Sequence, residues 1–571
     1  MREHPTDERL KALRQKLSSL SVDGFIQPMN DAFQSEYVPD ADARIPWLTG
    51  FTGSAGTLVI TQNDAVLFVD GRYTLQAENE LDTRLISYFN IADLSLTDWL
   101  EQHMDSALLG YDATLHTPAQ RKQWESHGIE TKPIENPVDA IWADRPSAPC
   151  GEITEKSVEL AGLSREEKIQ SLIKKMDSDA DACFVALPDA VNWLLNIRGN
   201  DIPYNPLLLS EAVIWRDGSV DVFVNSSQVE PLKALLGALM QGLNVHSIAA
   251  RGTWLKAQGN ITFQYDPSQT SCAVIDAMAD AEFCEASDPV TYLKAVKNEI
   301  EIQGMKKAHE VDGIAVSHFI DWLKEAVKSK AVTELEASAK LEEFRKQHPD
   351  YTQPSFTTIS GAGPNGAIVH YRVTEESNLR LGKDTLYLVD SGGQYPYGTT
   401  DITRTIAIGT PSEEMKTRYT QVLKGHIALA DAVFPTGTTG AELDVLARQY
   451  LWQDGVDYAH GTGHGVGHHL CVHEGPQGIS RRSNKVALQA GMILSNEPGY
   501  YKNGEYGIRI ENLILVIEKG KYEDGRTRLG FETITLAPLD EALIDRSLLT
   551  SKEVEWLKHY HARVERLLSS A

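Results

Sequence analysis

The sequence has few cysteines, no long apolar run and no excess of basic residues, and each of these features excludes a class of protein. The 571 residues include only five cysteines, which are scattered along the chain. A small, odd and scattered set predicts free thiols in a reducing compartment, not a disulfide framework or a zinc cluster. Acidic residues outnumber basic residues by 80 to 54, which gives a formal net charge of -26. We therefore expect no nucleic-acid partner.

Membrane and secretory classes are also disfavoured. No stretch of about 18 or more apolar residues occurs, so we expect no transmembrane helix and no membrane partner. The N-terminal stretch MREHPTDERLKALRQKL is charged and amphipathic, and it lacks the apolar core of a secretory signal. Together with the free thiols, this predicts a cytoplasmic protein. The length predicts about three or four domains.

The first two units of the chain share a pattern. Residues 57–60 and 65–69 are β-type runs around a polar turn, which predicts a hairpin. A second unit begins with SREEKIQSLIKKM, in which Ser164 and Glu167 have the spacing of a capping box. It contains another hairpin around Asp217-Gly218. A duplicated domain would explain the repetition, although hairpins are common and two unrelated units are the alternative.

A third unit, from about residue 294 to the end, contains two segments that place carboxylates across a turn. In TLYLVDSGGQYPYGTTDITRTIAIG, Asp390 and Asp401 are symmetric about a point between Tyr395 and Pro396. We expect a hairpin in which the two carboxylates face each other directly.

The second segment, GMILSNEPGYYKNGEYGIRIENLILV, repeats this arrangement with Glu497 and Glu511 symmetric about Gly504. Facing carboxylates repel each other, so they need either open solvent or a cation between them. The flanking residues are apolar and typical of buried strands, which favours a metal ion. The alternative is that these are surface acids that face each other by accident.

A cluster of histidines completes the candidate site. The segment HGTGHGVGHHLCVHEGP has five histidines within 14 residues: His460, His464, His468, His469 and His473. It contains no H-E-x-x-H, no G-x-G-x-x-G and no P-loop, and its glycines disfavour the helix that a zincin needs. Four carboxylates with one imidazole form an oxygen-rich donor set. Such a set suits two ions of manganese or another divalent metal, and the chemistry we expect is metal-assisted hydrolysis.

Taken in order, the motifs resemble the cytosolic-type aminopeptidases P (Xaa-Pro aminopeptidases), which are long, three-domain metallopeptidases with a pita-bread fold. The matching motifs are QSEY, GFTGSAGT and DGRY in the first unit, WLLNIRG and DIPYNP in the second, and GPNGAIVHY, LVDSGGQY, TTDITRT, HGTGHGVG, VHEGP, NEPGYY and GIRIENL in the third. The resemblance implies an α/β (α+β) protein. Two creatinase-like α/β domains, at residues 1–155 and 156–297, would precede a pita-bread catalytic domain at residues 298–571.

The resemblance also implies roles for individual residues. The five metal ligands would be Asp390, Asp401, His464, Glu497 and Glu511. Asp401 and Glu511 would bridge two manganese ions, and Glu497 would also act as the acid/base. His370 and His473 match histidines that contact the substrate, His460 matches a further active-site histidine, and Arg509 matches an arginine near the metal carboxylates. The resemblance implies a homodimer that acts on peptides with proline in second place.

Two departures from the family pattern concern substrate contact. Phe33 stands where the family commonly has histidine, and His468-His469 stand where less basic residues are expected. The main alternative function is that of a prolidase, an Xaa-Pro dipeptidase with the same ligands. A catalytically inactive pita-bread binding protein, or a creatine-hydrolysing relative without metal, would not need all five ligands.

Overall fold

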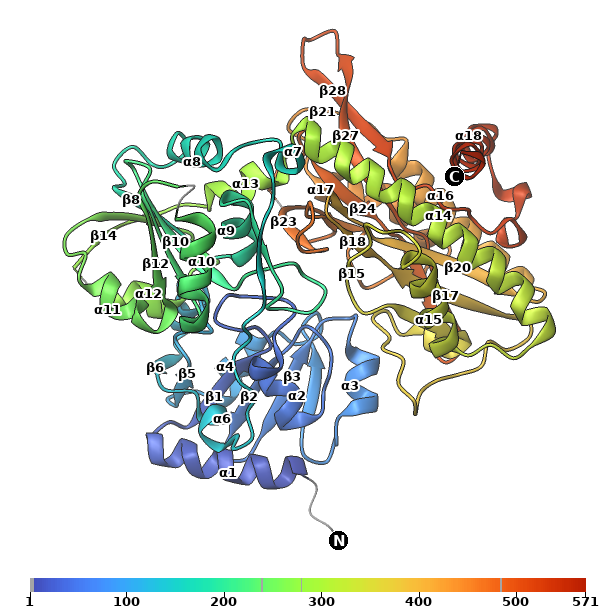
Figure 1. Cartoon of the computed structure of the whole chain (residues 1–571). Coiled ribbons are helices and arrows are strands. Elements are labelled where there is room, and N and C mark those ends of the chain that lie inside the picture. Colours follow the sequence, from blue (N-terminus) through green and yellow to red (C-terminus); the bar gives the residue numbers. More distant parts are fainter. Residues whose placement is uncertain (1–4, 238–239, 279, 483–484, 571) are drawn as a thin grey trace. The chain divides into compact units, whose positions relative to one another are not determined.

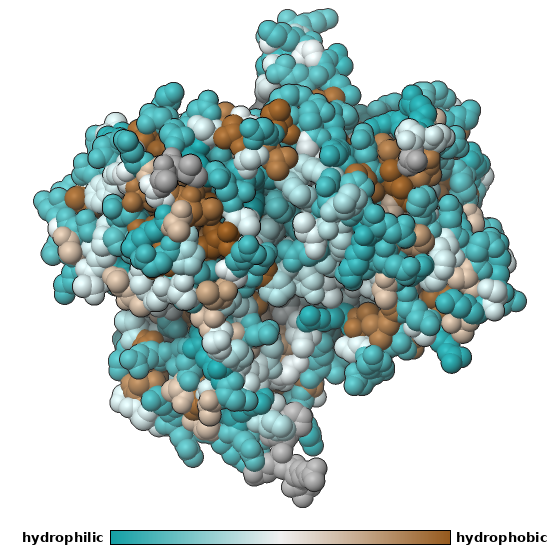
Figure 2. Space-filling model, in the orientation of Figure 1, coloured by the Kyte–Doolittle hydropathy of each residue, from teal (hydrophilic) through white to brown (hydrophobic). Residues whose placement is uncertain are grey.

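A computed structural model describes residues 5–237, 240–278, 280–482 and 485–570 of the chain (Figure 1). The chain forms two compact units, one comprising residues 1–156 and 163–290, the other residues 157–162 and 291–571. We describe each unit by itself. No helix within the described ranges has the length and apolar character needed to span a membrane. On the face shown in Figure 2, hydrophilic residues predominate and apolar residues form small scattered groups.

The first unit contains two six-stranded sheets. The strands of the first sheet are β1 (Gly24–Pro28), β2 (Thr57–Thr61), β3 (Ala65–Val69), β4 (Ser87–Asn90), β5 (Leu108–Tyr111) and β6 (Glu130–Pro133). The strands of the second sheet are β8 (Ala182–Val185), β10 (Ser210–Trp215), β11 (Val220–Val224), β12 (Leu243–Ser247), β13 (Thr262–Tyr265) and β14 (Glu282–Glu285). A separate two-stranded ladder joins β7 (Ile153–Glu155) and β9 (Ile197–Gly199).

Helices connect and cover these strands. They are α1 (Pro5–Leu20), α2 (Arg44–Thr49), α3 (Thr74–Glu80), α4 (Leu96–His103), α5 (Pro118–Ser126), α6 (Pro137–Ile141), α8 (Arg165–Ile173), α9 (Pro188–Leu194), α10 (Val229–Leu236), α11 (Arg251–Lys256) and α12 (Cys272–Ala277). The amphipathic α1 buries Leu10, Leu13 and Leu17 in the core of the first sheet. The predicted capping box of Ser164 and Glu167 begins α8.

The two sheets have the same topology. Their strand orders are β4-β3-β2-β1-β5-β6 and β12-β11-β10-β8-β13-β14. In each sheet the first strand pairs antiparallel with the second strand and parallel with the fifth. The predicted hairpins are β2–β3 and β10–β11, and both are antiparallel. The repeated hairpin therefore does reflect a repeated domain. The boundaries of the three predicted domains stay predictions.

The second unit contains the remaining sheets. Its strands are β15 (Gln353–Pro354), β16 (Ile359–Ala362), β17 (Thr385–Ser391), β18 (Gly393–Tyr395), β19 (Gly398–Thr399), β20 (Ile402–Ile408), β21 (Val433–Pro435), β22 (Gly463–Gly465), β23 (Glu474–Ile479), β24 (Ile493–Asn496), β25 (Gly499–Lys502), β26 (Tyr506–Arg509), β27 (Asn512–Lys521) and β28 (Thr527–Thr533). Its helices are α7 (Val158–Ala161), α14 (Glu299–Ser329), α15 (Glu334–Arg345), α16 (Glu413–Ala430), α17 (Gly440–Trp452) and α18 (Ser551–Ser569), and α13 (Pro289–Ala295) leads into it.

Long helices cover the sheets of this unit (Figure 1). The charged helix predicted near its start is α14, and it begins at a capping box in which Asn298 and Glu301 bond each other's backbone. Apolar residues of α14 and α15 pack on β17 and β20, with Phe319 and Leu341 in the same core as Tyr387. Helix α16 packs with α18 on the other hairpin, β25–β26.

The second carboxylate hairpin has the predicted register. Strands β24 and β27 pair Asn496 with Asn512, and β25 and β26 pair Gly499 with Arg509. Both ladders are centred on Gly504, which adopts a φ of +74° in the turn. Glu497 and Glu511 lie between the two ladders and are symmetric about that glycine, as predicted.

The first carboxylate hairpin also forms, but its predicted register is wrong by two residues. Asp390 pairs with Thr403, not with Asp401, and the turn lies at residues 396–397, between Tyr395 and Gly398. The prediction put Pro396 in the second central position of the turn. Proline is disfavoured there and favoured in the first position, which it occupies here. Asp390 and Asp401 are therefore diagonal neighbours.

One buried histidine of the first unit generates a prediction about acid stability. Burial lowers the pKa of His116 to about 4. In the unfolded chain histidine has a pKa near 6.5. Below that pH the unfolded state therefore binds a proton at this position that the folded state does not bind. Folding stability is therefore lost as the pH falls from about 6.5 towards about 4, by about 3 kcal/mol in total.

Chemical denaturation at pH 7 and pH 5 of the parent, His116→Gln and His127→Gln proteins measures this contribution. We expect the loss of unfolding free energy between these pH values to shrink by about 2 kcal/mol in His116→Gln. The exposed His127 serves as the control, and its replacement should leave the loss unchanged. An unchanged loss in His116→Gln would contradict the assignment.

Candidate metal centre

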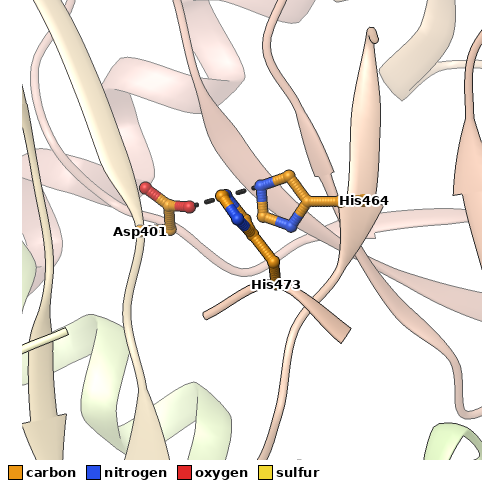
Figure 3. A group of neighbouring side chains, drawn as sticks. All are labelled: Asp401, His464 and His473. Carbon is orange, nitrogen blue, oxygen red and sulfur yellow. Dashed lines mark ion pairs between the residues drawn. The ribbon is translucent and has the colours of Figure 1, made fainter. Parts of the chain in front are cut away.

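The predicted metal ligands meet in one cluster. Three overlapping groups of side chains have donor atoms within 4.8 Å of one another: Asp401, His464 and His473; His464, Glu497 and Glu511; and Asp390, Asp401 and Glu511. The residues lie far apart in the sequence, on or next to β17, β20, β22, β24 and β27. Figure 3 shows Asp401, His464 and His473 converging from separate segments of the chain.

Backbone contacts hold these segments against one another. The amide of Glu497 donates to the carbonyl of Thr462 at 2.8 Å, and the amide of Glu511 donates to that of Thr403 at 3.2 Å. A Cβ on Gly463 would lie 2.0 Å from the carbonyl oxygen of Ser495. Glycine at this position therefore allows the strand of His464 to approach β24 closely enough to join the cluster.

The carboxylates of the cluster are buried together. The relative exposures of Asp390, Asp401 and Glu511 are 8%, 3% and 1%. Burial raises the pKa of Asp390 to about 6, with a further contribution from the charge of Asp401. Burial also holds the pKa of Glu511 well above its ordinary value, and the charges of Asp401 and Glu497 add to the effect. Such a site is strongly stabilised by a cation.

Asp390 fits a metal ligand for a second reason. Its Oδ2 accepts a hydrogen bond from Arg509 Nη2 at 2.5 Å, but its buried Oδ1 has no hydrogen-bond partner among the described residues. An unsatisfied buried carboxylate oxygen is costly unless something outside the protein pairs with it. The oxygen-rich donor set suits hard divalent ions such as manganese.

His464 is oriented for the same purpose. Its Nδ1 lies 2.9 Å from the carbonyl oxygen of Gly465, so this nitrogen keeps its proton when Nε2 loses its own to bind a metal ion. Its Nε2 then points to the carboxylates, 3.5 Å from Asp401 Oδ2 and 3.4 Å from Glu497 Oε1. Burial alone would lower the pKa of His464, but the hydrogen bond to Asp401 and the charges of Glu497 and Asp401 raise it to about 9.

A chain of hydrogen bonds surrounds the cluster. Arg509 donates to Asp390, to Tyr501 Oη at 2.7 Å and to Thr403 Oγ1 at 3.2 Å. Thr403 in turn donates to Glu511 Oε2 at 2.7 Å, and Tyr501 Oη lies 2.8 Å from His460 Nε2. The structure thus brings both His460 and Arg509 next to the cluster, as expected from the sequence.

Tyr501 and Thr403 belong to this hydrogen-bond network, and the sequence analysis did not single out either of them. Both lie within recognised motifs, NEPGYY and TTDITRT, and that position was the only available signal. Which of the neighbouring polar residues turns towards the carboxylates depends on strand register. For the first hairpin the predicted register was wrong.

The two histidines expected to contact substrate differ in position. The ring of His473 lies 4.3 Å from that of His464, at an interplanar angle of 74°, so it belongs to the cluster. His370 is half-buried on the segment that follows the 3₁₀ turn at Gly363–Ala367. Ile368, on the same segment, packs in a small apolar cluster that includes Tyr501.

The two departures from the family pattern also have definite positions. His468 is buried, with Nδ1 3.8 Å from Glu301 Oε1 on α14, and His469 adopts a φ of +53°. Both lie in the loop between β22 and β23. Phe33 is half-buried in the first unit, where its amide donates to Asp31 Oδ1 at 2.9 Å.

Known proteins share this three-part organisation. The model of metallopeptidase family M24 matches residues 303–518, and that of the C-terminal region of peptidase M24 matches residues 527–571. Two models of the creatinase/prolidase N-terminal domain match residues 9–141 and 144–301.

Individual relatives match over nearly the whole chain. A probable Xaa-Pro aminopeptidase P of Talaromyces marneffei is 41% identical over 98% of this chain and 89% of its own. The X-prolyl aminopeptidase of Caenorhabditis elegans, described as a cytosolic enzyme with a di-nuclear active site, has a TM-score of 0.94 at 35% identity, covering 100% of this chain and 97% of its own. An Xaa-Pro dipeptidase from Bacillus anthracis has a TM-score of 0.53 at 26% identity, covering 66% of this chain and 99% of its own.

The fold and the carboxylate cluster are those of a metallopeptidase in which two creatinase-type domains precede a pita-bread domain. The chain belongs to metallopeptidase family M24 and, within it, to the long members that include the Xaa-Pro aminopeptidases P. The family, the fold and the class of enzyme that the motifs predict are therefore confirmed.

Proposed function

We propose that this chain is a metal-dependent aminopeptidase that removes the first residue from peptides with proline in second place. The observation that carries the proposal is the cluster of four carboxylates and one imidazole, in a chain with full-length similarity to Xaa-Pro aminopeptidases. Its proposed ligands for two divalent ions are Asp390, Asp401, His464, Glu497 and Glu511. Asp401, His464 and Glu511 each belong to two of the three ligand groups, and of these only the two carboxylates have a second oxygen with which they could bridge two ions.

Two divalent ions held by these five side chains would supply Lewis-acid chemistry, namely a shared water of lowered pKa and a polarised substrate carbonyl. Glu497 accepts the proton that the attacking water loses and later delivers it to the leaving nitrogen. Its carboxylate is well oriented for this role, because Ser495 Oγ donates to its Oε1 at 3.1 Å. His460 Nδ1 lies 3.9 Å from its Oε2.

His473 and His370 act on the peptide. His473 stands at the edge of the cluster, beside His464, where it can donate a hydrogen bond to the oxygen that becomes negative as water attacks. His370 contacts the peptide from the segment that follows the 3₁₀ turn at Gly363–Ala367. Arg509 holds Asp390 through its guanidinium, and Tyr501 links that arginine to His460. The imide bond before proline lacks an N–H. A site that cleaves it therefore needs contacts that differ from those for an ordinary peptide bond.

An aminopeptidase is favoured over a dipeptidase by the extent of the similarity. The dipeptidase of Bacillus anthracis covers 66% of this chain, whereas the Caenorhabditis elegans aminopeptidase covers all of it. We further propose manganese as the metal, a homodimer as the assembly and the cytoplasm as the location. The oxygen-rich donor set supports manganese, and the cytosolic C. elegans relative supports the location.

The first prediction concerns metal. Protein purified without chelator should contain up to two divalent ions per chain by elemental analysis, because three buried carboxylates and the half-buried Glu497 need compensation. Dialysis against a chelator should abolish cleavage of Ala-Pro-Ala, and added manganese should restore it. Full activity of thoroughly metal-free protein would refute the proposed mechanism.

The second prediction concerns Glu497. Glu497→Gln should lower kcat by about a thousandfold or more, because an amide cannot accept the proton of the water. Circular dichroism and the melting temperature should stay near those of the parent. Glu505→Gln, an exposed change on the same hairpin, is the matched control and should retain parental kcat. Near-parental turnover in Glu497→Gln would show that another group is the base.

The third prediction separates the candidate functions with a panel of peptides: Ala-Pro, Ala-Pro-Ala, Ala-Ala-Ala and N-acetylated Ala-Pro-Ala. We expect efficient release of alanine from Ala-Pro-Ala, little from Ala-Ala-Ala and none after acetylation. Cleavage of Ala-Pro alone would identify a prolidase. Cleavage that is indifferent to acetylation would exclude an aminopeptidase, and binding without any cleavage would identify an inactive binding protein.

A further inference from the structure

Behind the carboxylate cluster lies a buried carboxylate that belongs to none of the ligand groups. Asp312, on α14, has no exposed surface. Its two oxygens accept from Arg345 Nε at 2.6 Å and Nη2 at 3.0 Å, from Thr400 Oγ1 at 2.6 Å and from Tyr395 Oη at 3.1 Å. Burial alone would raise the pKa of Asp312, but Arg345 and Thr400 hold it below its ordinary value. The group is thus a permanently charged acceptor.

The pair of Asp312 and Arg345 forms hydrogen bonds with residues on both arms of the first carboxylate hairpin. Thr400 directly precedes Asp401. On the other strand, Arg345 Nη2 also donates to Ser391 Oγ at 3.1 Å, and Ser391 directly follows Asp390. Asp312 and Arg345 therefore connect α14 and α15 to the residues next to both aspartates, through the side chains of Thr400 and Ser391.

A second buried carboxylate, that of Glu334, is also held by several hydrogen-bond donors, but it has another target, and burial raises its pKa above the ordinary value. Glu334, at the start of α15, has no exposed surface and forms no ion pair among the described residues. Its oxygens accept from the amide of Ala362 at 2.7 Å, from Asn365 Nδ2 at 3.0 Å, from Tyr371 Oη at 3.0 Å and from the amide of Leu379 at 2.8 Å. The positive end of the α15 dipole further stabilises this charge.

The donors to Glu334 bracket the segment that carries His370. Ala362 and Asn365 lie before that histidine, Tyr371 directly follows it, and Leu379 ends the segment. Four residues of the segment 362–379 thus donate hydrogen bonds to one carboxylate, and none of them is a proposed metal ligand.

We propose that Asp312 and Glu334 are positioning residues with separate targets in the site. Asp312 holds the hairpin of Asp390 and Asp401 in the geometry that binds metal, whereas Glu334 holds the segment of His370 in the geometry that binds the peptide. The inference rests on the proposed function. It adds a division of labour between two buried carboxylates, Asp312 on α14 and Glu334 on α15, whose helices supply no metal ligand themselves.

The test compares Asp312→Asn with Glu334→Gln in the full chain. Manganese is titrated into chelator-treated protein by calorimetry, and Ala-Pro-Ala kinetics are measured at saturating manganese. Asp312→Asn should weaken the binding of at least one ion about tenfold or more. Glu334→Gln should bind manganese within about twofold of the parent, yet raise KM about fivefold or more with little change in kcat.

Hydrogen exchange provides a readout that needs neither metal nor activity. Exchange should increase within residues 385–409 in Asp312→Asn and within residues 362–379 in Glu334→Gln. Ser391→Ala and Tyr371→Phe are milder variants that guard against misfolding of the two carboxylate variants. Ser391→Ala removes one hydrogen bond of the Asp312 network, whereas Tyr371→Phe removes the hydroxyl that bonds Glu334, Asn365 and Ser377, and each should show the same pattern, weakened. Ser317→Ala is the matched control, since the hydroxyl of buried Ser317 donates, among the residues that the structure describes, only to the carbonyl of Gly313 within α14.

The outcomes are distinct. If both carboxylate variants change metal affinity alike, or neither changes exchange in its own segment, the division of labour is wrong. If the parent binds manganese but leaves Ala-Pro-Ala intact, the proposed function fails, while the calorimetry and exchange still decide the roles of Asp312 and Glu334.

Discussion

Repulsion among buried carboxylates is the constraint on which the catalytic unit depends. At about 4 Å and an effective dielectric constant near 20, each pair of like charges costs about 4 kcal/mol. Asp390, Asp401 and Glu511 are brought to such distances while almost completely removed from water. One guanidinium, that of Arg509, offsets part of this cost through Asp390. In the proposed function, two divalent ions would supply the remaining compensation.

A site of this kind needs a scaffold that resists the repulsion when metal is absent. The ligands are accordingly attached to strands, whose backbones are fixed by ladder hydrogen bonds and by buried polar side chains behind them. Arg404 illustrates the second device, since its guanidinium donates to the carbonyl of Glu511 at 2.7 Å and to Asn512 Oδ1 at 2.8 Å. Buried charges of this type are costly unless every donor is used. Here they fix the strand that carries a ligand.

How much could be predicted from the sequence follows from the range of the forces involved. The hairpins depend on local alternation and turns, so both were predicted together with their four carboxylates, whereas the choice of His464 among five clustered histidines came only from the family resemblance. The Glu497–Glu511 register was right because Gly504 marks the turn centre, whereas the Asp390–Asp401 register was wrong because the position of Pro396 in the turn was misjudged. Asp312 and Glu334 gave no signal in the sequence. Acidic residues on charged helices are usually exposed, and only the tertiary packing buries these two.

The two hairpins also explain why carboxylates can gather at all. Each hairpin belongs to two sheets: β17–β20 gives way to β18–β19, and β24–β27 gives way to β25–β26. Within a continuous ladder, facing carboxylates would be held in contact by the register on one flat surface. At the change of sheet the ladder is interrupted, and the carboxylates of both hairpins lie at or next to that interruption. The side chains there can turn from the cross-strand direction towards a common point. The repeated break in the sheets, more than the acidic residues alone, therefore distinguishes a metal centre from two pairs of surface acids.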